Sequence, residues 1–325
     1  MNAGPSDDGA EAKSERTTIR IALDAFGADE CPGPEVAGAI EAARAGVDVL
    51  LVGDEAKLTA KLNETPGWKD LPISIHHAPD VITMEDSPSK AVRGKPEASM
   101  PVAFDLVKQG EADAVMSAGN SGAMLACGLF KYRRIKGVDR PALVTSLPTV
   151  KGGFVTFLDV GANVECRPIN LTQWAVLGSV YASFKHGKDK PRVGVLSNGT
   201  EDSKGTELTR SVHSLLSEHP SEDFVYGGQV EGDDLFGSEF DVVVTDGFTG
   251  NVALKIAEAT GRMIGRWLKG AVTKGPLAMA GALLLKPAFR DLKAMLNPDS
   301  YGAAPLLGVN GVAFICHGSA SSYAI

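Results

Sequence analysis

The chain lacks the short motifs of several large enzyme families, and it has few cysteines. It contains no GxGxxG, GxxxxGK[ST], GxSxG or HExxH sequence, so nothing in it predicts a dinucleotide fingerprint, a P-loop, a nucleophile elbow or a zinc-protease helix. Its four cysteines are far apart and form no CxxC pair. Such spacing is typical of reduced cytosolic thiols rather than of a disulfide framework or a zinc site. We therefore expect no metal and no cofactor.

Long apolar runs and excess positive charge are also missing. No segment reaches the ~18 consecutive apolar residues of a membrane-spanning helix, and the net charge of −8 argues against general nucleic-acid binding. A composition of 44% hydrophobic and 22% charged residues suits a cytoplasmic globular protein of one large domain or two lobes. Residues 1–17 are small and polar and are predicted to be a disordered leader. Residues 321–325 follow an apolar strand and Gly318 and resemble the start of a helix, so we expect the natural chain to be longer.

Apolar runs alternate with helix-type patterns along the chain. This alternation predicts an α/β fold with a mostly parallel sheet and helices on both faces. Prolines at residues 79–101 predict mostly loop there, and Gly152 and Gly153 predict a hairpin or another tight connection between two strands. Strands are predicted over residues 19–23, 47–52, 73–77, 114–117, 142–149, 154–160, 193–197 and 241–245. Helices are predicted over residues 35–45, 55–62, 101–108, 123–132, 171–186, 251–269 and 277–296.

Two stretches place a glycine-bearing polar loop between a strand and a helix, at residues 193–207 and 242–255. In an α/β protein such a loop lies at the carboxyl end of its strand. The helix N-terminus there offers free N–H groups and the positive end of its dipole, which suits an anion. Lys204 in the first loop and Asn251 in the second are expected to meet one anion. The alternative for Lys204 is a solvated surface lysine paired with a neighbouring carboxylate, Glu201 or Asp202.

Other loops are less specific. Residues 117–122, SAGNSG, can cradle an anion with backbone N–H groups, or they form an ordinary turn in which Asn120 or Ser121 caps a helix. Residues 159–163, DVGAN, offer a carboxylate and an amide at a strand end, or only a turn. The histidines at 76, 77 and 317 suit core or capping roles better than metal ligation.

The two long helices predicted over residues 251–269 and 277–296 carry apolar stripes, interleaved with basic residues in the second. Such stripes are typical of a hairpin packed on its own core or on a second subunit. The tip, residues 278–285, has no charge, which also suits contact with a membrane surface. Both roles are compatible if the stems pack and the tip stays exposed. The residues predicted to touch the membrane are Leu283, Leu284, Leu285 and Phe289.

Taken in order, ten segments resemble the bacterial acyl-ACP:phosphate acyltransferase (PlsX) family. They are DAFGADECPGP (24–34), LVGD (51–54), SPSKAVRGKPEASM (87–100), SAGNSGA (117–123), DVGAN (159–163), SNGTEDSKGTEL (197–208), EGDD (231–234), DGFTGNVALK (246–255), YGAAPLLGVNG (301–311) and HGSAS (317–321). The resemblance runs from about residue 19 to the end. In the first segment the family usually has a Met-Gly-Gly-Asp version of the loop. Ala28 stands in place of a glycine and slightly narrows the range of backbone conformations there. The family's usual C-terminal helix is missing.

The resemblance implies transfer of a long-chain acyl group from acyl-ACP to inorganic phosphate, which gives acyl phosphate for phospholipid synthesis. It also implies a homodimer and a fold like that of isocitrate and isopropylmalate dehydrogenases, shared with phosphate acetyltransferases. We expect one two-lobed domain over residues 18–325. The family's protruding helical hairpin corresponds to residues 261–297, and in the family it contributes to dimer packing and to peripheral membrane contact.

The residues suit this reaction. Phosphate is already an anion at neutral pH and a thioester is activated, so the enzyme has to hold phosphate in line and stabilise the tetrahedral oxyanion. The predicted catalytic residues are Lys204 and Asn251. The residues predicted to bind substrate are Asp24, Ser117, Asn120, Ser121, Gly122, Asn163, Asn198, Gly199, Asp246 and Thr249.

The acyl carrier is acidic, and the best basic run of the chain is KYRRIK at residues 131–136. Arg133 and Arg134 are predicted to dock the carrier; the alternative is that these cations offset the dipole at a helix C-terminus. Three other functions stay open. They are a phosphate acetyl- or butyryltransferase that uses a CoA thioester, a metal- and NAD-dependent dehydrogenase of the same architecture, and a membrane-docked scaffold that binds the carrier without turnover.

Overall fold

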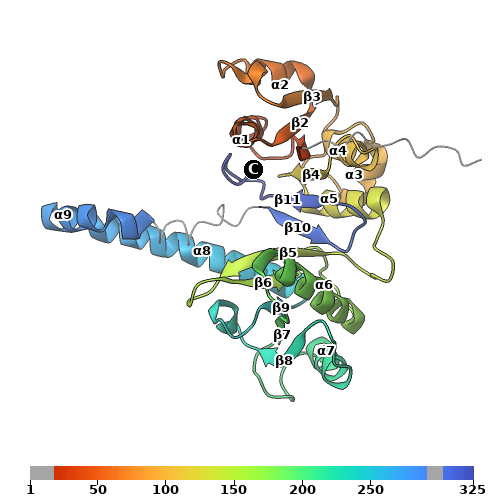
Figure 1. Ribbon diagram of the computed structural model, residues 1–325, viewed down its shortest axis with the longest axis vertical. Helices are drawn as coiled ribbons and strands as arrows, with labels where there is room; N and C mark the ends of the chain where they lie inside the picture. Colours follow the sequence, from red (N-terminus) through yellow and green to blue (C-terminus); the bar gives the residue numbers. More distant parts are fainter. Residues whose placement is uncertain (1–17, 291–302) are drawn as a thin grey trace, which may run out of the picture.

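One twisted sheet organises the molecule from end to end. The structure is a computed structural model that describes residues 18–290 and 303–325. Within these ranges eleven strands lie in the order β3-β2-β1-β4-β11-β10-β5-β6-β9-β7-β8, and helices pack along the sheet (Figure 1). Most neighbouring strands are parallel, as the alternation of elements predicts.

The elements before the centre of the chain are β1 (Arg20–Asp24), α1 (Gly33–Arg44), β2 (Asp48–Gly53), α2 (Glu55–Leu62), η1 (Trp68–Asp70), β3 (Ile73–His77), α3 (Pro88–Gly94), α4 (Ser99–Lys108), β4 (Ala114–Ser117), α5 (Ser121–Cys127) and η2 (Gly128–Tyr132). The elements after it are β5 (Ala142–Pro148), β6 (Phe154–Leu158), α6 (Pro168–His186), β7 (Arg192–Leu196), α7 (Glu207–Glu218), β8 (Val225–Val230), η3 (Asp234–Phe236), β9 (Val242–Val244), α8 (Gly247–Val272), α9 (Pro276–Leu284), β10 (Ala304–Leu307) and β11 (Ala313–Ile315).

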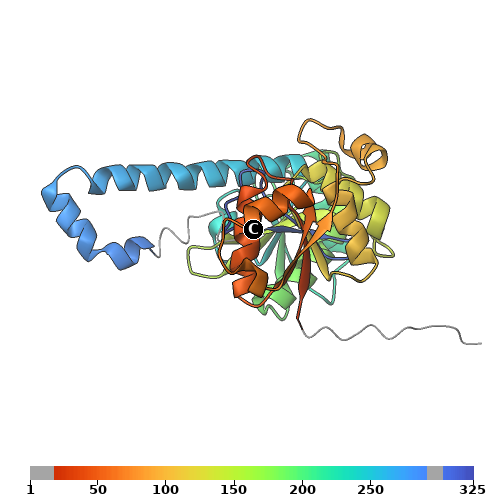
Figure 2. The ribbon, with the colours of Figure 1, turned by 90° about the horizontal axis from the view of Figure 1, so that it is seen from above.

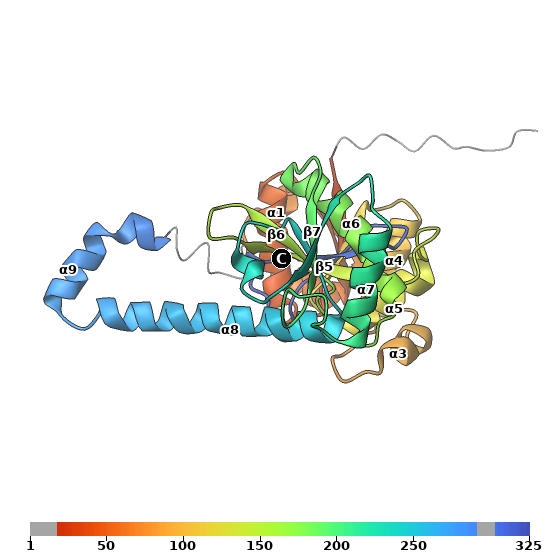
Figure 3. The ribbon, with the colours of Figure 1, turned by 90° about the horizontal axis from the view of Figure 1, so that it is seen from below.

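Side chains of β2 show that the sheet is buried on both faces. Leu51 belongs to the same buried cluster as Val36 of α1, whereas Leu50 belongs to the same cluster as Phe104 of α4. Because successive side chains of a strand point to opposite faces, α1 and α4 lie on opposite sides of the sheet (Figure 3). Burial on both faces is typical of parallel sheets and explains the continuous apolar runs in the sequence.

The two halves of the sheet run in opposite directions. Strands β1, β2, β3, β4 and β11 are parallel to one another, and so are β6, β9, β7 and β8. Antiparallel pairings join β11 to β10, β10 to β5 and β5 to β6. Six steps in the strand order separate β1 from β9, and each step adds a twist of about 20–25°. This twist partly offsets the reversal, and the segments that follow β9 and β11 come close enough for Lys255 to contact His317.

Helix α8 leaves the carboxyl end of β9 and extends far beyond the sheet. It spans 26 residues and starts four residues before the predicted position, because Asp246 caps it at Gly247. The outer part of α8 stands away from the body of the molecule (Figure 1), and α9 turns back beside it (Figure 2). Over its described residues, this arrangement is the protruding hairpin that the sequence predicts.

The second helix of the hairpin differs from the prediction. The sequence predicts one helix over residues 277–296, but α9 ends at Leu284, Leu285 lies in a turn, and helical backbone resumes over residues 286–290. Pro287 explains the break, because it lacks the amide hydrogen that would bond to the carbonyl of residue 283 and continue α9. The remainder of that predicted helix, and the leader over residues 1–17, lie outside the described residues.

Three other expectations need correction. The sequence predicts mostly loop over residues 79–101, and more than half of this stretch is loop, but it also holds the unpredicted α3 and the start of α4. The helix predicted over residues 123–132 begins at Ser121 and ends in a π-helical turn, η2. Strands β8 and β10 were not predicted, because two glycines occupy the centre of the first and Pro305 the second, and these residues are depleted in strands. The predicted hairpin between β5 and β6 is confirmed.

Candidate active site

Asp24 and Ser117 tie together the carboxyl ends of β1 and β4. The Ser117 hydroxyl donates to Asp24 Oδ2 at 2.7 Å and accepts from the Gly119 N–H at 3.0 Å. Asp24 is 1% exposed. Burial raises the pKa of this carboxyl, and hydrogen bonds from Ser99 and Ser117 oppose the rise. Asp24 and Ser117, both predicted to bind substrate, therefore have internal partners. In the structure they hold the loop over residues 117–122 in shape.

Asn120 is the residue that fixes this loop against its neighbour. Its Oδ1 accepts from the Ala123 N–H at 3.1 Å and so caps α5. Its Nδ2 donates to the carbonyls of Thr83, Met84 and Asp86 at 3.2–3.4 Å. The capping role that the sequence offered as an alternative is thus present. Ser121 is exposed in the first turn of α5, and Gly122 packs tightly against Pro88, 2.7 Å from where a Cβ would lie.

The DVGAN loop after β6 is organised by one buried carboxylate. Asp159 accepts from the backbone N–H groups of Leu143 and Asn163 at 2.9 and 2.7 Å, and from Asn163 Nδ2 at 2.9 Å. Burial raises the pKa of Asp159, and the hydrogen bond from the Asn163 side chain is the largest opposing effect. Asn163 Nδ2 also donates to the Pro141 carbonyl at 2.8 Å. Asn163, predicted to bind substrate, therefore uses its amide to hold the loop.

The first turn of α8 packs directly on this loop. The Gly247 N–H donates to the Asn163 carbonyl at 2.8 Å, and a Cβ on Gly250 would lie 1.9 Å from the Asp159 carbonyl oxygen. Asp246 caps the helix by accepting from the Thr249 N–H at 2.9 Å and from the Thr249 hydroxyl at 2.8 Å. The predicted binding residues Asp246 and Thr249 are thus partners of each other.

Asn251 and Lys204 differ from all these residues, because their head groups are free. Asn251 is exposed and lies beside Gly161 of the DVGAN loop, and within the described residues its amide makes no hydrogen bond. Lys204 is exposed, and its ammonium has no hydrogen-bonding or ionic partner in residues 18–290 and 303–325. The pairing of Lys204 with Glu201 or Asp202 that the sequence left open is therefore not seen.

The loop that carries Lys204 is nevertheless well anchored. Asn198 Oδ1 accepts from the Gly205 N–H at 2.8 Å, and Gln229 donates to the Glu201 carbonyl at 2.9 Å. Gly199 packs against the Lys204 stem, since a Cβ there would lie 2.6 Å from Lys204 Cγ. Strands β7 and β9 are parallel neighbours, so this loop and the start of α8 leave the same edge of the sheet side by side. Between the described atoms, no hydrogen bond joins Lys204 to Asn251.

Two residues that the sequence analysis did not select also lie here. Lys255 is four residues after Asn251 on α8, and its Nζ contacts Nε2 of His317 and Glu258 Oε2, the latter at 3.1 Å. His317 follows β11 in the other half of the sheet. Burial, and then the Lys255 charge, lower the pKa of His317. The spacing of four from Asn251 was the signal in the sequence, because residues four apart share a helix face.

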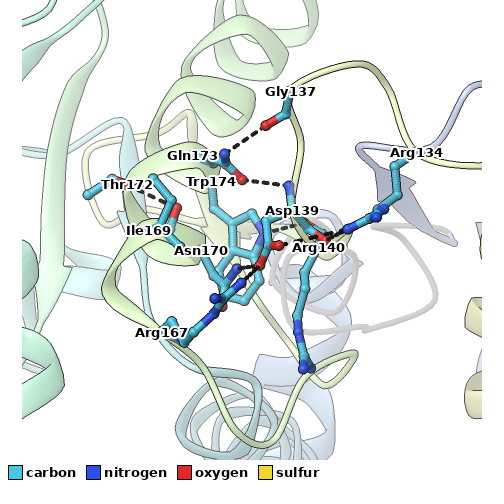
Figure 4. A network of polar contacts seen from close by, with 10 residues as sticks. All are labelled: Arg134, Gly137, Asp139, Arg140, Arg167, Ile169, Asn170, Thr172, Gln173 and Trp174. Atoms are coloured by element: carbon cyan, nitrogen blue, oxygen red, sulfur yellow. Dashed lines mark hydrogen bonds and ion pairs between the residues drawn. The ribbon is translucent and has the colours of Figure 1, made fainter.

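The predicted docking arginines have different surroundings. Arg134 donates to the Asp139 carbonyl and lies 3.8 Å from its carboxylate, which also accepts from Arg167 at 2.6 Å (Figure 4). Lys131 pairs with Asp105 at 2.6 Å. Arg133 is exposed and its guanidinium has no partner among the described residues. Of the two arginines, Arg133 is thus the one whose charge is not already paired.

Comparison with known proteins shows the family of the chain. Residues 19–325 match the family model described as "Fatty acid synthesis protein". A Geobacter sulfurreducens protein named Phosphate acyltransferase is 48% identical over 308 residues, which cover 94% of this chain and 88% of the relative. A protein of the same name from Citrifermentans bemidjiense is 50% identical over 308 residues, covering 94% and 86%. The chain belongs to the phosphate acyltransferase (PlsX) family. Its resemblance to this family in the sequence is thereby confirmed.

Solved structures confirm the predicted fold of this phosphate acyltransferase family member. A branched-chain phosphotransacylase from Enterococcus faecalis V583 superposes with a TM-score of 0.57 at 15% identity, covering 94% of each chain. The EutD phosphotransacetylase from Staphylococcus aureus gives 0.56 at 18% identity, covering 94% of this chain and 91% of its own. A 4-hydroxythreonine-4-phosphate dehydrogenase from Klebsiella pneumoniae gives 0.51 at 15% identity, covering 94% of each. Likeness at such low identity concerns the fold alone.

None of the helices in residues 18–290 and 303–325 combines the length and the apolar character needed to cross a bilayer. The same residues hold no group of three or more His, Cys, Asp or Glu side chains arranged for a metal ion.

Proposed function

We propose that the protein transfers a long-chain acyl group from acyl-ACP to inorganic phosphate, releasing acyl phosphate and free ACP. The observation that carries this proposal is the contrast within the site. Most polar side chains at the strand ends are paired internally, whereas the Lys204 ammonium and the Asn251 amide are exposed and unpaired in the described structure. A free cation and a free amide on neighbouring loops suit an anionic substrate and an anionic transition state.

The chemistry needs little beyond positioning. A phosphate oxygen attacks the thioester carbonyl, a tetrahedral oxyanion forms, and the thiolate of the carrier leaves as the carbonyl is restored. We assign Lys204 to the phosphate or the oxyanion, and Asn251 to a second hydrogen bond to the same anion. Backbone N–H groups of residues 117–122, apart from that of Gly119, which donates to Ser117, and those of residues 198 and 199 complete the anion cradle. Asp24, Ser117, Asn120, Asn163, Asp246 and Thr249 keep the substrate-binding loops in shape.

We further propose a homodimer that binds the membrane peripherally through the tip of the hairpin, in a cytoplasmic setting. Exposed apolar side chains on α8 support contact with a second copy of the chain. Phe248, Ile256 and Trp267 are 62%, 62% and 67% exposed. At the tip, Leu283, Leu284 and Leu285 are 71%, 84% and 55% exposed, which supports contact with lipid, while Phe289 is only partly exposed. We propose Arg133 as the main docking residue for the acidic carrier.

Release of free ACP thiol from palmitoyl-ACP, with and without inorganic phosphate and in the absence of metal, tests the reaction. We expect release that depends on phosphate, and much slower reaction with palmitoyl-CoA and acetyl-CoA. In the same assay Lys204→Ala should lower kcat by roughly 10²-fold or more, because removal of one such donor costs about that much. Lys69→Ala, which removes an exposed lysine of η1, is the matched control. Folded Lys204→Ala with a kcat near that of the unmodified protein would refute the role of Lys204.

A further inference from the structure

A contact between Lys255 and His317 joins the two halves of the sheet beside the proposed site. Lys255 belongs to α8, which follows β9, and His317 follows β11. The Nζ of Lys255 contacts Nε2 of His317. The next residue, Gly318, accepts from the Asp29 N–H at 2.9 Å, which ties this segment to the loop after β1. Segments that follow β9, β11 and β1 are therefore linked to one another here, the first two through Lys255.

We propose that Lys255 is a second cationic residue that binds a phosphate group at this site, and that His317 is the residue that positions it. The identity of the substrates rests on the function proposed above. The cationic site itself rests on the contacts of the described residues.

The helix places Lys255 where a phosphate near Asn251 can reach it. Residues four apart share one face of a helix, and four residues advance about 6 Å along its axis. Asn251 lies beside Gly161, at the carboxyl end of β6. One turn further, Lys255 faces the segment after β11. An anion that the Asn251 amide binds is thus within reach of a lysine side chain, whose ammonium is held on a long stem.

Two of the three N–H groups of the Lys255 ammonium have partners, and one is left for a ligand. An ammonium has three N–H donors. One is directed to Glu258 Oε2 at 3.1 Å and one to His317 Nε2, so a third remains for a ligand. Because Nε2 accepts, the network assigns the imidazole proton to Nδ1, which lies 3.4 Å from the Ser319 hydroxyl. The pKa of His317, lowered by burial and by the Lys255 charge, is in keeping with an uncharged imidazole.

The local charge favours an anion. Glu258 is shared between Lys255 and Arg262, whose Nη1 lies 3.7 Å from the carboxylate. One carboxylate between two cations leaves one positive charge on this face of α8. The Glu258 side chain is 15% exposed, whereas that of Lys255 is 39% exposed, so the carboxylate is covered and the ammonium is open. Asp29, on the loop after β1 in the same half of the sheet as His317, is a second carboxylate besides Glu258 that acts on His317.

A phosphate group can reach Lys255 from two sources. One is inorganic phosphate, and the other is the phosphodiester in the prosthetic arm of the acyl carrier. Both sources present anionic oxygens to Lys255, and steady-state kinetics distinguishes them. Loss of a contact with inorganic phosphate raises the KM for phosphate, whereas loss of a contact with the phosphodiester raises the KM for acyl-ACP.

The decisive variants are Lys255→Gln and Lys255→Arg. We expect Lys255→Gln to raise one of the two KM values by about tenfold or more, as for loss of a hydrogen bond to a charged group, and Lys255→Arg to recover most of the loss. His317→Ala should raise the same KM by a smaller factor, and His317→Gln, which keeps an acceptor, should recover it. Lys69→Gln is the control. Unchanged KM values for both substrates in folded Lys255→Gln would overturn the proposal, even if kcat or Tm falls.

A binding measurement separates this proposal from the proposed reaction. Inorganic phosphate alone is titrated into each variant while Tm is recorded, since a ligand of the folded state raises Tm. If the unmodified protein gains Tm from phosphate and Lys255→Gln loses that gain, the site stands even where no thiol is released. If acyl transfer proceeds normally in Lys255→Gln, with unchanged KM values and an unchanged response of Tm to phosphate, the reaction stands and the site is refuted.

Discussion

At the scale of single residues, polar side chains around the strand ends divide into those that hold loops and those that are free. Asp24, Asn120 and Asp159 each accept or donate several internal hydrogen bonds. Lys204 and Asn251 have none through their head groups in the described part of the chain. The sequence predicts that all of these residues lie near strand ends, because each follows an apolar run. It cannot tell the two groups apart, because the partners come from segments distant in sequence, such as Thr83 for Asn120.

Buried Glu35 predicts an unusual dependence of stability on pH. Glu35 on α1 is 0% exposed and accepts from the Ala28 N–H at 3.0 Å, and burial raises its pKa from 4.5 to about 7. Between these values the folded state binds a proton that the unfolded state has released. The free energy of unfolding should therefore fall as pH rises from about 4.5 to about 7. The raised pKa of Asp24 acts with the same sign at lower pH.

Urea unfolding at several pH values checks this prediction. Glu35→Gln should flatten the decline between about pH 4.5 and 7, and it should be relatively more stable at pH 8 than at pH 5 when compared with the unmodified protein. Glu41→Gln, an exposed position on the same helix, should keep the decline. If Glu35→Gln and Glu41→Gln gave the same pH profile, burial of the Glu35 carboxyl would not be its cause.

At the scale of elements, the seating of α8 on the DVGAN loop is the critical contact. A Cβ on Gly250 would lie 1.9 Å from a backbone oxygen of Asp159, which cannot give way as a side chain could. Gly250→Ala should therefore displace the start of α8, destabilise the protein by roughly 1–3 kcal/mol, and lower kcat because Asn251 and Lys255 move with the helix. Gly265→Ala, in the same helix with open space around the Cβ position, should leave kcat unchanged and slightly raise Tm.

Steady-state kinetics and thermal unfolding of both variants make this comparison. Equal effects of Gly250→Ala and Gly265→Ala would show that the close approach to Asp159 is not required. The sequence predicts a helix from residue 251 and leaves Gly247 and Gly250 in the loop before it, but it does not reveal which glycine touches a backbone atom. That distinction depends on how β6 and β9 pair, which is a tertiary fact.

The hairpin tip gives a second prediction at this scale. The double variant Leu283→Glu, Leu284→Glu should bind anionic lipid vesicles at least about tenfold more weakly, because two exposed leucines that insert into the interface are replaced by charges. Its turnover with soluble palmitoyl-ACP should be unchanged. Val150→Glu, an apolar residue 81% exposed in the β5–β6 turn, is the control in vesicle co-sedimentation. Equal binding of the double variant and the control would contradict a membrane role for the tip.

At the scale of the whole molecule, one continuous sheet consists of two parallel halves that run in opposite directions. Antiparallel pairings through β10 and β5 join them. The sequence predicts the alternation of strands and helices, and hence the layers, because apolar runs and their breaks are local signals. It does not predict that β10 and β11 return to insert between β4 and β5. That insertion brings His317 to α8, so the contact between His317 and Lys255 beside the site could not be predicted from the sequence. The continuous sheet supports our proposal that residues 18–325 form one two-lobed domain.

Recognition of an acidic carrier is also a property of the whole molecule. The chain has a net charge of −8, so its overall field repels an acidic partner, and docking requires a local positive patch. The structure distinguishes the two arginines predicted for this patch. Arg134 is engaged with Asp139, whose carboxylate also pairs with Arg167, whereas Arg133 is exposed and without a partner in the described residues.

Single charge reversals therefore predict different outcomes. Arg133→Glu should raise the KM for acyl-ACP by roughly five- to tenfold at low ionic strength with Tm unchanged, and the effect should shrink as salt screens the charges. Arg134→Glu should mainly lower Tm, because it places a second carboxylate beside Asp139 and opposes the loop that Arg167 and Asn170 hold (Figure 4). Initial rates over a series of acyl-ACP and salt concentrations, with Tm of each variant, check both. An unchanged KM in Arg133→Glu at low salt would place the docking surface elsewhere, because reversing a charge that attracts the acidic carrier must weaken its binding.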